Sequence, residues 1–295
     1  MRKHPVILGI ILLVCLGVLS AFFLYGMGIF ADSKRSFNFQ GSIGIVPIEG
    51  IISDSGDVVA QIDEFADDKS IRAVVLRINS PGGGVAPSQE IYQAVLELKK
   101  TKKVVVSMGS VAASGGYLIS VAADRILANP GTITGSISAV MHHASIEELM
   151  KKIGISSSVV KSGKFKDIGS PTRKMSQEET ALIQGIVDDI YDQFVEVIAQ
   201  NRKIPLENIL QLADGRIFSG RQAKTRGLID DLGGFRDAVM LAGKLAGIEG
   251  KPEIVYGMKK KNTVLHYLSG SMMSGFFESV GNKGGDFTGA LYLLQ

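Results

Sequence analysis

The chain has 295 residues, 45% of them hydrophobic, which is enough to bury a substantial core in one medium-sized domain. Its formal net charge of +3, with short basic clusters at residues 99–103 and 259–261, gives no case for a nucleic-acid partner. Cys15 is the only cysteine, which excludes a disulfide framework and a thiolate metal site, and the four histidines form no HExxH motif. We therefore expect neither a metal nor another cofactor.

The N-terminal part of the chain has the features of a membrane anchor. Residues 5–31 contain no charged residue, and this run exceeds the roughly 20 residues that span a bilayer as a helix. Arg2 and Lys3 precede the run, whereas the charges after it partly cancel, so the positive-inside rule places the N-terminus in the cytoplasm. A cleavable signal peptide is the alternative, but its apolar region should be only about 7 to 15 residues long. We expect an uncleaved anchor over residues 1–31, followed by a linker over residues 32–42.

Beyond the linker, buried β-branched runs alternate with amphipathic segments, which favours an α/β fold with a mostly parallel sheet. The predicted strands are residues 43–48, 71–78, a run from residue 104, 125–128, 133–141 and 157–161. The predicted helices are residues 57–68, 87–100, 145–153, 177–201, 206–213, 219–226 and 235–245, with a short helix ending near residue 123. Capping boxes at Ser145 with Glu148, and at Ser176 with Glu179, predict two of the helix starts.

Two of the strands are followed by glycine-rich turns. Residues 79–84 (NSPGGG) follow one strand, and residues 109–116 (GSVAASGG) follow the next. Parallel strands bring their carboxyl ends to one edge of the sheet, so we expect the two turns to face each other across one pocket.

Ser114 lies in the second turn, between two alanines and two glycines, so that a substrate backbone can approach its hydroxyl closely. The backbone N–H groups that follow it are unpaired in a first helical turn and favour an anion. A tightly packed structural turn is the alternative. A nucleophilic serine needs a base, and a lysine base needs its pKa, ordinarily about 10.4, lowered by burial. The candidate bases are His142, His143, His266, Lys161, Lys164 and Lys166.

Four motifs in order carry a resemblance to a known family. They are NSPGGG at residues 79–84, SMGSVAASGGY at 107–117, NPGTITGSIS at 129–138 and KSGKFKDIGSPTR at 161–173. This set resembles signal peptide peptidase A in its short bacterial form, a member of the ClpP/crotonase superfamily. The resemblance covers roughly residues 43–245 and implies an α/β spiral of ββα units over residues 43–250.

The resemblance also implies the chemistry. Ser114 corresponds to the nucleophile of a Ser/Lys dyad, Lys166 to its general base and Ser136 to the hydroxyl that orients the lysine. The backbone N–H groups of Gly83 and Gly115 correspond to an oxyanion hole. The implied protein is a serine endopeptidase that degrades remnant signal peptides and other apolar peptides through an acyl-enzyme.

The resemblance further implies a homo-oligomeric ring whose protomers share active sites, and the weak net charge predicts no nucleic-acid partner. With the predicted anchor and the positive-inside rule, we expect a single-pass protein of the bacterial inner membrane whose catalytic domain lies on the periplasmic side. The tail, residues 251–295, is expected to dock into the substrate groove or to be partly disordered, and its apolar end suggests a product-like or inhibitory peptide. Two other functions stay open: a crotonase-like acyl-CoA enzyme, and a non-catalytic membrane scaffold of the same fold.

Overall fold

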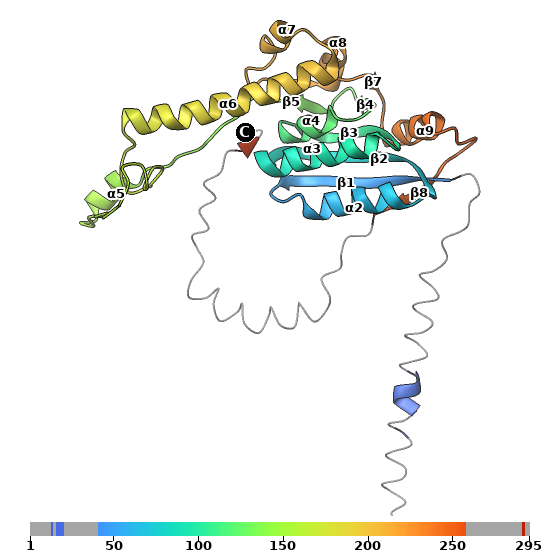
Figure 1. Ribbon diagram of the computed structural model, residues 1–295, viewed down its shortest axis with the longest axis horizontal. Helices are drawn as coiled ribbons and strands as arrows, with labels where there is room; N and C mark the ends of the chain where they lie inside the picture. The colour runs from blue at the N-terminus through green and yellow to red at the C-terminus, as the bar shows by residue number, and fades with distance from the viewer. Residues whose placement is uncertain (1–12, 14–15, 21–40, 258–290, 293–295) are drawn as a thin grey trace, which may run out of the picture. The chain divides into compact units, whose positions relative to one another are not determined.

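The computed structural model describes residues 13, 16–20, 41–257 and 291–292 (Figure 1). The chain divides into two compact units, Met1–Phe39 and Gln40–Gln295. In the first unit, residues 13 and 16–20 are helical. No helix among the described residues is long and apolar enough to cross a bilayer. Most of the predicted anchor, the linker up to residue 40 and the greater part of the predicted tail lie outside the described residues.

The second unit is built on one mixed β-sheet. In the described part of the chain its nine strands are β1 (Ser42–Ile52), β2 (Ile71–Gly84), β3 (Lys103–Ala113), β4 (Arg125–Ala128), β5 (Ile133–Gly135), β6 (Ile217–Ser219), β7 (Asp231–Leu232), β8 (Glu253–Tyr256) and β9 (Leu291–Tyr292). The main order is β6-β5-β3-β2-β1-β8; β4 joins β3 to β7, and β9 pairs with β2. All pairs are parallel except β5 with β6 and β2 with β9. The parallel centre agrees with the sequence prediction, and β8 lies in the stretch assigned to the tail.

Side chains alternate between two cores on the two faces of the sheet. In β3, Val104 and Val106 join the larger core, whereas Val105 joins the smaller one. The same alternation occurs in β2, where Val74 and Leu76 face one core while Val75 faces the other. A strand places successive side chains on opposite faces, and a parallel sheet covered on both faces needs apolar residues on each. The continuous β-branched runs therefore form the centre of the sheet.

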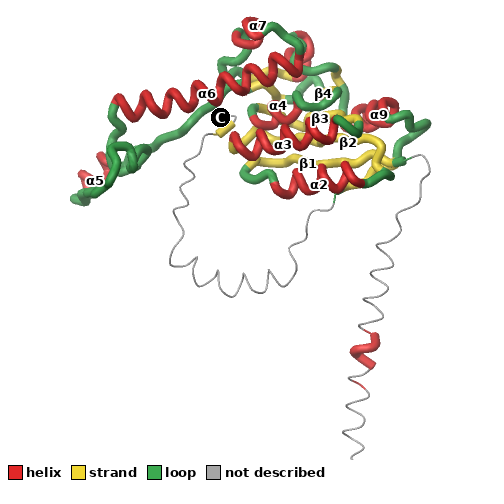
Figure 2. The backbone as a smooth tube through the Cα atoms, in the orientation of Figure 1, coloured by secondary structure: helices red, strands yellow, loops and turns green. Residues whose placement is uncertain are grey.

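Helices cover both faces (Figure 2). They are α2 (Gly56–Asp67), α3 (Val85–Lys99), α4 (Gly115–Ser120), α5 (Glu147–Lys152), α6 (Gln177–Arg202), α7 (Leu206–Leu210), α8 (Gly220–Thr225) and α9 (Phe235–Leu245). Helices α2, α3, α4 and part of α6 contribute to the larger core, and α9 packs on the smaller core.

Helix α6 reaches beyond the sheet together with α5 and the loop between them (Figure 1). The buried apolar residues of α6, Phe194, Val195 and Ile198, all lie toward its C-terminal end. Leu182 and Ile186, nearer its N-terminal end, are 45% and 49% exposed. We call α5, the loop over residues 153–176 and the N-terminal half of α6 the arm.

Several element predictions were wrong in detail. Residues 79–84 are not a turn after a strand, because β2 continues through them to Gly84. The strand expected over residues 133–141 ends at Gly135, since the backbone turns at positive φ in the next residue. Residues 157–161 form no strand. The capping box expected at Ser145 is absent, because α5 starts at Glu147 without a side-chain cap.

Candidate active site

Ser114 occupies the sharp junction between β3 and α4. Its backbone has φ 54° and ψ −118°, a conformation that costs a residue with a Cβ on the order of 1–3 kcal/mol. Two hydrogen bonds hold it: the Ser114 N–H donates to the Gly135 carbonyl at 2.8 Å, and the Leu118 N–H donates to the Ser114 carbonyl at 2.9 Å. The strained turn is therefore fixed by β5 on one side and by α4 on the other.

The Ser114 hydroxyl is buried and has no hydrogen-bond partner among the described residues. The residue is only 1% exposed. An unsatisfied buried hydroxyl is unfavourable by about 1–3 kcal/mol, and most buried polar atoms avoid this state. Strain and an unpaired hydroxyl at one residue are typical of a functional position and not of a turn that only packs.

The two glycine-rich segments meet at this junction. A Cβ on Gly115 would lie 3.5 Å from the Gly82 Cα and 2.3 Å from the Ser88 hydroxyl. A Cβ on Gly83 would lie 2.2 Å from the carbonyl oxygen of Ile52 in the neighbouring strand. Both glycines thus permit close backbone approach. Gly115 is also the first residue of α4, where backbone N–H groups have no partner within the helix.

Ser136 lies beside Ser114 in the fold. It follows Gly135, whose carbonyl accepts the Ser114 N–H, and its own N–H donates to the Arg216 carbonyl at 2.9 Å. Ser136 is 6% exposed and also has positive φ, 51°. The sheet edge at β5 therefore brings the two serines together, with the backbone of each pinned by a neighbouring segment.

Lys166 lies elsewhere in the chain, in the exposed loop of the arm. Since the Ser114 hydroxyl has no partner among the described residues, the Lys166 ammonium does not reach it within this protomer. The structure thus brings together Ser114, Gly83, Gly115 and the Ser136 backbone, and it leaves Lys166 apart.

The other candidate bases are less available than Lys166. Lys161 pairs with Asp167, and Lys164 pairs with Glu178. Within the described residues, Lys166 makes no side-chain hydrogen bond or ion pair, which leaves its amine available.

The candidate histidines give no alternative base among the described residues. His142 and His143 are exposed in the segment after β5, and His266 is among the residues that the structure does not describe. No group of three metal-binding side chains occurs in the described part of the chain.

Strand β9 lies against the glycine segment of β2. Tyr292 pairs with Gly83 and Leu291 with Gly84 in antiparallel register. An extended peptide that adds a strand to a sheet edge is bound mainly through its backbone. Residues 291–292 therefore occupy a strand-binding edge next to the predicted oxyanion hole.

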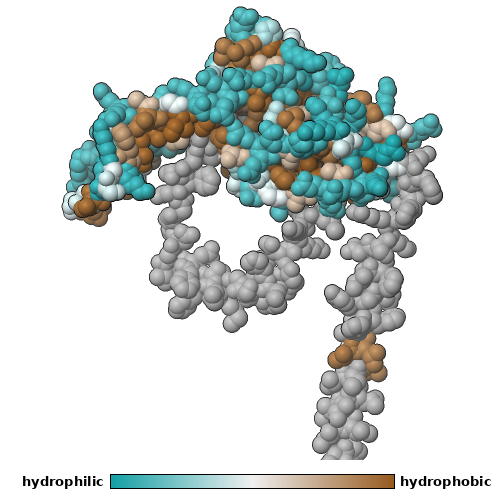
Figure 3. Space-filling model, viewed as in Figure 1, coloured by the Kyte–Doolittle hydropathy of each residue, from teal (hydrophilic) through white to brown (hydrophobic). Residues whose placement is uncertain are grey.

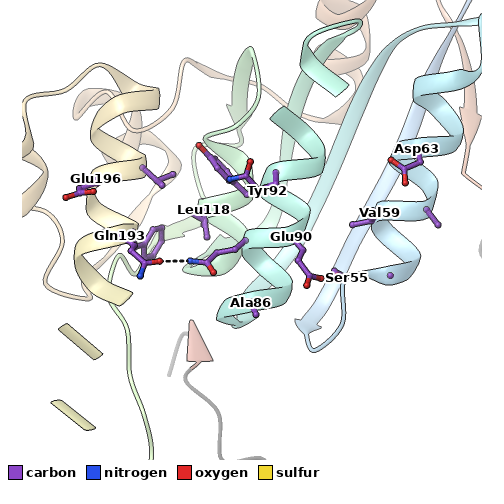
Figure 4. A pocket seen from close by; sticks show the side chains of 15 residues that line it. Ser55, Val59, Asp63, Ala86, Glu90, Tyr92, Leu118, Gln193 and Glu196 are labelled. Atoms are coloured by element: carbon purple, nitrogen blue, oxygen red, sulfur yellow. Dashed lines mark hydrogen bonds between the residues drawn. The ribbon is translucent and has the colours of Figure 1, made fainter. Parts of the chain in front are cut away.

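A groove of about 1000 Å³ lies over α3, between α2 and α6 (Figure 4). The Ser55 hydroxyl donates to Glu90 on one side, and the Gln89 amide donates to Gln193 at 3.0 Å on the other. None of the five predicted site residues lines the groove, although Ala86, just beyond the end of β2, does. The groove therefore does not contain the reactive groups of the predicted site.

Comparison with known proteins identifies the family of the chain. The family model for Clp protease matches residues 46–132, which contain the β2 glycine segment and Ser114, and assigns the sheet to a ClpP/crotonase-like α/β fold. The model for peptidase family S49 matches residues 97–249. The chain belongs to peptidase family S49, a family of serine peptidases of the signal peptide peptidase A type.

Three relatives illustrate the similarity. A protein of Synechocystis sp. named as a candidate protease is 42% identical over 199 residues, covering 68% of this chain and 72% of the relative. A candidate signal peptide peptidase SppA of Enterococcus faecium is 36% identical over 206 residues, covering 65% and 60%. The chloroplastic serine protease SPPA of Arabidopsis thaliana is 34% identical over 192 residues, covering 65% and 28%.

Sequence reasoning missed the groups that hold the site in place. The backbone carbonyls of Gly135 and Arg216 accept the N–H groups of Ser114 and Ser136. Such backbone contacts leave no pattern of side chains in the sequence by which they could be predicted. It also missed the ion pairs of Arg173 around the Lys166 loop, although Arg173 closes the fourth sequence motif.

Proposed function

We propose that this serine peptidase cleaves remnant signal peptides and other apolar peptides with a dyad of Ser114 and Lys166. The observation that carries the proposal is the buried, unpaired Ser114 hydroxyl at a strained strand-to-helix junction. Membership of peptidase family S49 supports serine peptidase chemistry at this hydroxyl.

The lysine comes from a neighbouring protomer in the assembly we propose, a homo-oligomeric ring. Ser114 has no base among the described residues of its own chain, and Lys166 is exposed on an arm without a described partner. The arm also carries an apolar surface, to which Leu149, Ile153, Leu182 and Ile186 contribute (Figure 3). A second copy seated on this surface covers the apolar side chains and supplies Lys166 to Ser114 in one contact. Head-to-tail repetition of such a contact closes into a ring.

The reaction in this assembly is an acyl transfer. The neutral Lys166 amine takes the Ser114 proton as Oγ attacks the peptide carbonyl, and the N–H groups of Gly83 and Gly115 bind the resulting oxyanion. Each such donor is worth about 3 to 4 kcal/mol in comparable sites. The lysine ammonium then protonates the leaving amine as the C–N bond breaks. Water hydrolyses the ester by the same route and restores the Ser114 hydroxyl. Ser136 hydrogen-bonds the lysine amine and aims it.

Substrates bind as extended strands along the β2 glycine segment. The pairing of β9 with Gly83 and Gly84 supports this mode, because a tail segment already occupies the edge that a peptide would need. The chain's own end, residues 291–295, then acts as a product-like inhibitor. Its apolar sequence, LYLLQ, resembles the apolar cores of signal peptides.

The location we propose is the bacterial inner membrane. The uncharged run over residues 5–31 forms a single anchor with a cytoplasmic N-terminus, and the catalytic domain, a spiral of ββα units, lies on the periplasmic side. Apolar peptides partition into a bilayer, so an anchored peptidase meets them there.

The test uses the purified full-length chain in detergent. We expect wild type to cleave apolar peptides, and Ser114→Ala and Lys166→Ala to lose turnover while keeping the same oligomer. Equal turnover in all three proteins would exclude the dyad. A correctly assembled wild type that cleaves no peptide would favour a scaffold, and binding of coenzyme A esters would favour an acyl-CoA enzyme.

A further inference from the structure

Arg173 connects the Lys166 loop to the start of α6. Its Nε donates to the Asp167 carboxylate at 2.8 Å, and Nη2 donates to the Asp167 carbonyl at 3.2 Å. The same guanidinium donates to both carboxylate oxygens of Glu179, at 2.8 and 2.5 Å. A planar guanidinium with two such contacts fixes direction as well as distance.

The far end of this connection is rigid. Glu179 is 4% exposed and also accepts the Ser176 N–H at 2.8 Å, while the Ser176 hydroxyl accepts the Glu179 N–H at 3.2 Å. This capping box fixes the first turn of α6. Arg173 therefore ties the residue after Lys166 to a buried, hydrogen-bonded helix start.

Asp167 is the carboxylate next to Lys166 in the sequence, and both of its oxygens are occupied. Lys161 pairs with one oxygen and Arg173 with the other. These two cations, Arg173 first, hold the pKa of Asp167 well below its usual range. The Asp167 side chain is thereby held between the two ends of the loop, Lys161 and Arg173.

The arm places many charged groups around this loop. They are Lys161, Lys164, Asp167, Arg173 and Lys174 from the loop and its end, Glu178 and Glu179 from α6, and Glu147, Glu148 and Lys151 from α5. Lys164 pairs with Glu178, and Lys151 pairs with both glutamates of α5. With those pairs made, Arg173 is the cation that bridges Asp167 and Glu179.

We infer that Arg173 is a positioning residue for Lys166: by tying Asp167 to the start of α6, it fixes the loop that presents the amine. The inference rests on the proposed role of Lys166 as the general base. A base must be neutral and correctly placed, and a displacement of about 1 Å can lower the rate on the order of 100-fold.

The first test is steady-state peptide cleavage by the full-length protein. We expect Arg173→Gln to lower kcat about 10- to 100-fold with little change in KM. Arg173→Lys keeps the charge but loses the planar fork, so kcat should fall in this variant as well. Lys100→Gln removes an exposed ion pair with Glu97, outside the arm, and serves as the matched control. An unchanged kcat in Arg173→Gln, or a loss that appears in KM alone, would refute a role in placing the base.

The second test asks which chain needs Arg173. Co-expressed Ser114→Ala and Lys166→Ala chains should regain about one quarter of wild-type activity in a mixed ring. A site is complete only where a chain that keeps Ser114 adjoins a chain that keeps Lys166, and each of these conditions holds in about half of the cases. Adding Arg173→Gln to the Ser114→Ala chain, which supplies Lys166, should lower this activity at least ten times more than adding it to the Lys166→Ala chain. Equal losses from both additions would show a general structural role and overturn the inference.

The two tests separate this inference from the proposed function. If the mixed chains stay inactive while wild type is active, the shared site is wrong, and the separate effects of Arg173→Gln on kcat and KM then decide the role of Arg173. If Lys166→Ala retains the turnover of wild type, Lys166 is not the base and the dyad is wrong. The inference about Arg173 is then wrong as well.

Discussion

The hydroxyl of Ser114 should contribute nothing to stability, in contrast to that of a neighbouring buried serine. The Ser80 hydroxyl donates to the Gly50 carbonyl at 2.6 Å and accepts the Gly82 N–H at 3.1 Å, whereas the Ser114 hydroxyl has no described partner. Both serines are almost completely buried. Removing two buried hydrogen bonds costs about 2 to 3 kcal/mol, but removing an unsatisfied hydroxyl costs nothing and can gain about 1 kcal/mol.

The comparison is made in a Lys166→Ala background, which removes the proposed partner from another protomer. One kcal/mol corresponds to about 2 to 4 °C in Tm for a domain of this size. We expect Ser80→Ala to lower Tm by roughly 4 to 12 °C, and Ser114→Ala to leave it unchanged or raise it by up to about 4 °C. The chain has no tryptophan, so far-UV circular dichroism at equal protein concentration is the appropriate probe. A drop for Ser114→Ala as large as that for Ser80→Ala would show that the hydroxyl is structural.

Three further outcomes follow from other contacts. Tyr117→Phe removes the buried hydrogen bond that the phenol donates to the Leu228 carbonyl at 2.8 Å. We expect the folded state to lose about 1 to 2 kcal/mol of stability in thermal unfolding while peptide turnover persists, and an unchanged Tm would contradict this. The Arg173 guanidinium and then the Ser176 N–H lower the pKa of Glu179 from 4.5 to about 2. The resulting stability is complete above about pH 4.5 and is lost as the pH falls toward 2, so wild type and Glu179→Gln should differ most at neutral pH and converge near pH 2 in acid unfolding. Deleting residues 291–295 frees the β2 edge and should lower KM for apolar peptides, and unchanged peptide affinity and turnover would exclude an inhibitory tail.

The centre of the fold was predictable because local pattern and tertiary environment agree there. The β-branched runs became the parallel strands, and the helix expected over residues 235–245 has those bounds. The arm was less predictable. Ser145 and Glu148 have capping-box spacing, yet α5 starts at Glu147 without a side-chain cap, whereas the same spacing at Ser176 forms a capping box whose Glu179 is also held by Arg173.

The position of Ser114 was predictable from small residues between a strand and a helix, because that sequence needs a tight junction. Its strain and its unpaired hydroxyl were not, since both depend on backbone groups that are distant in sequence, such as the Gly135 carbonyl. The separation of Lys166 from Ser114 has a similar cause. A sequence motif identifies Lys166 as a candidate base. Whether its amine contacts Ser114 depends on the direction in which the arm extends from the sheet.

The most direct test of the central claim is covalent trapping of the nucleophile. A fluorophosphonate reacts with an activated serine, and peptide mapping by mass spectrometry then identifies the modified residue. We predict one adduct on Ser114 in the assembled wild type, and none in Lys166→Ala of the same oligomeric state. An adduct on another serine, or equal labelling of Ser114 without Lys166, would contradict the Ser114/Lys166 dyad.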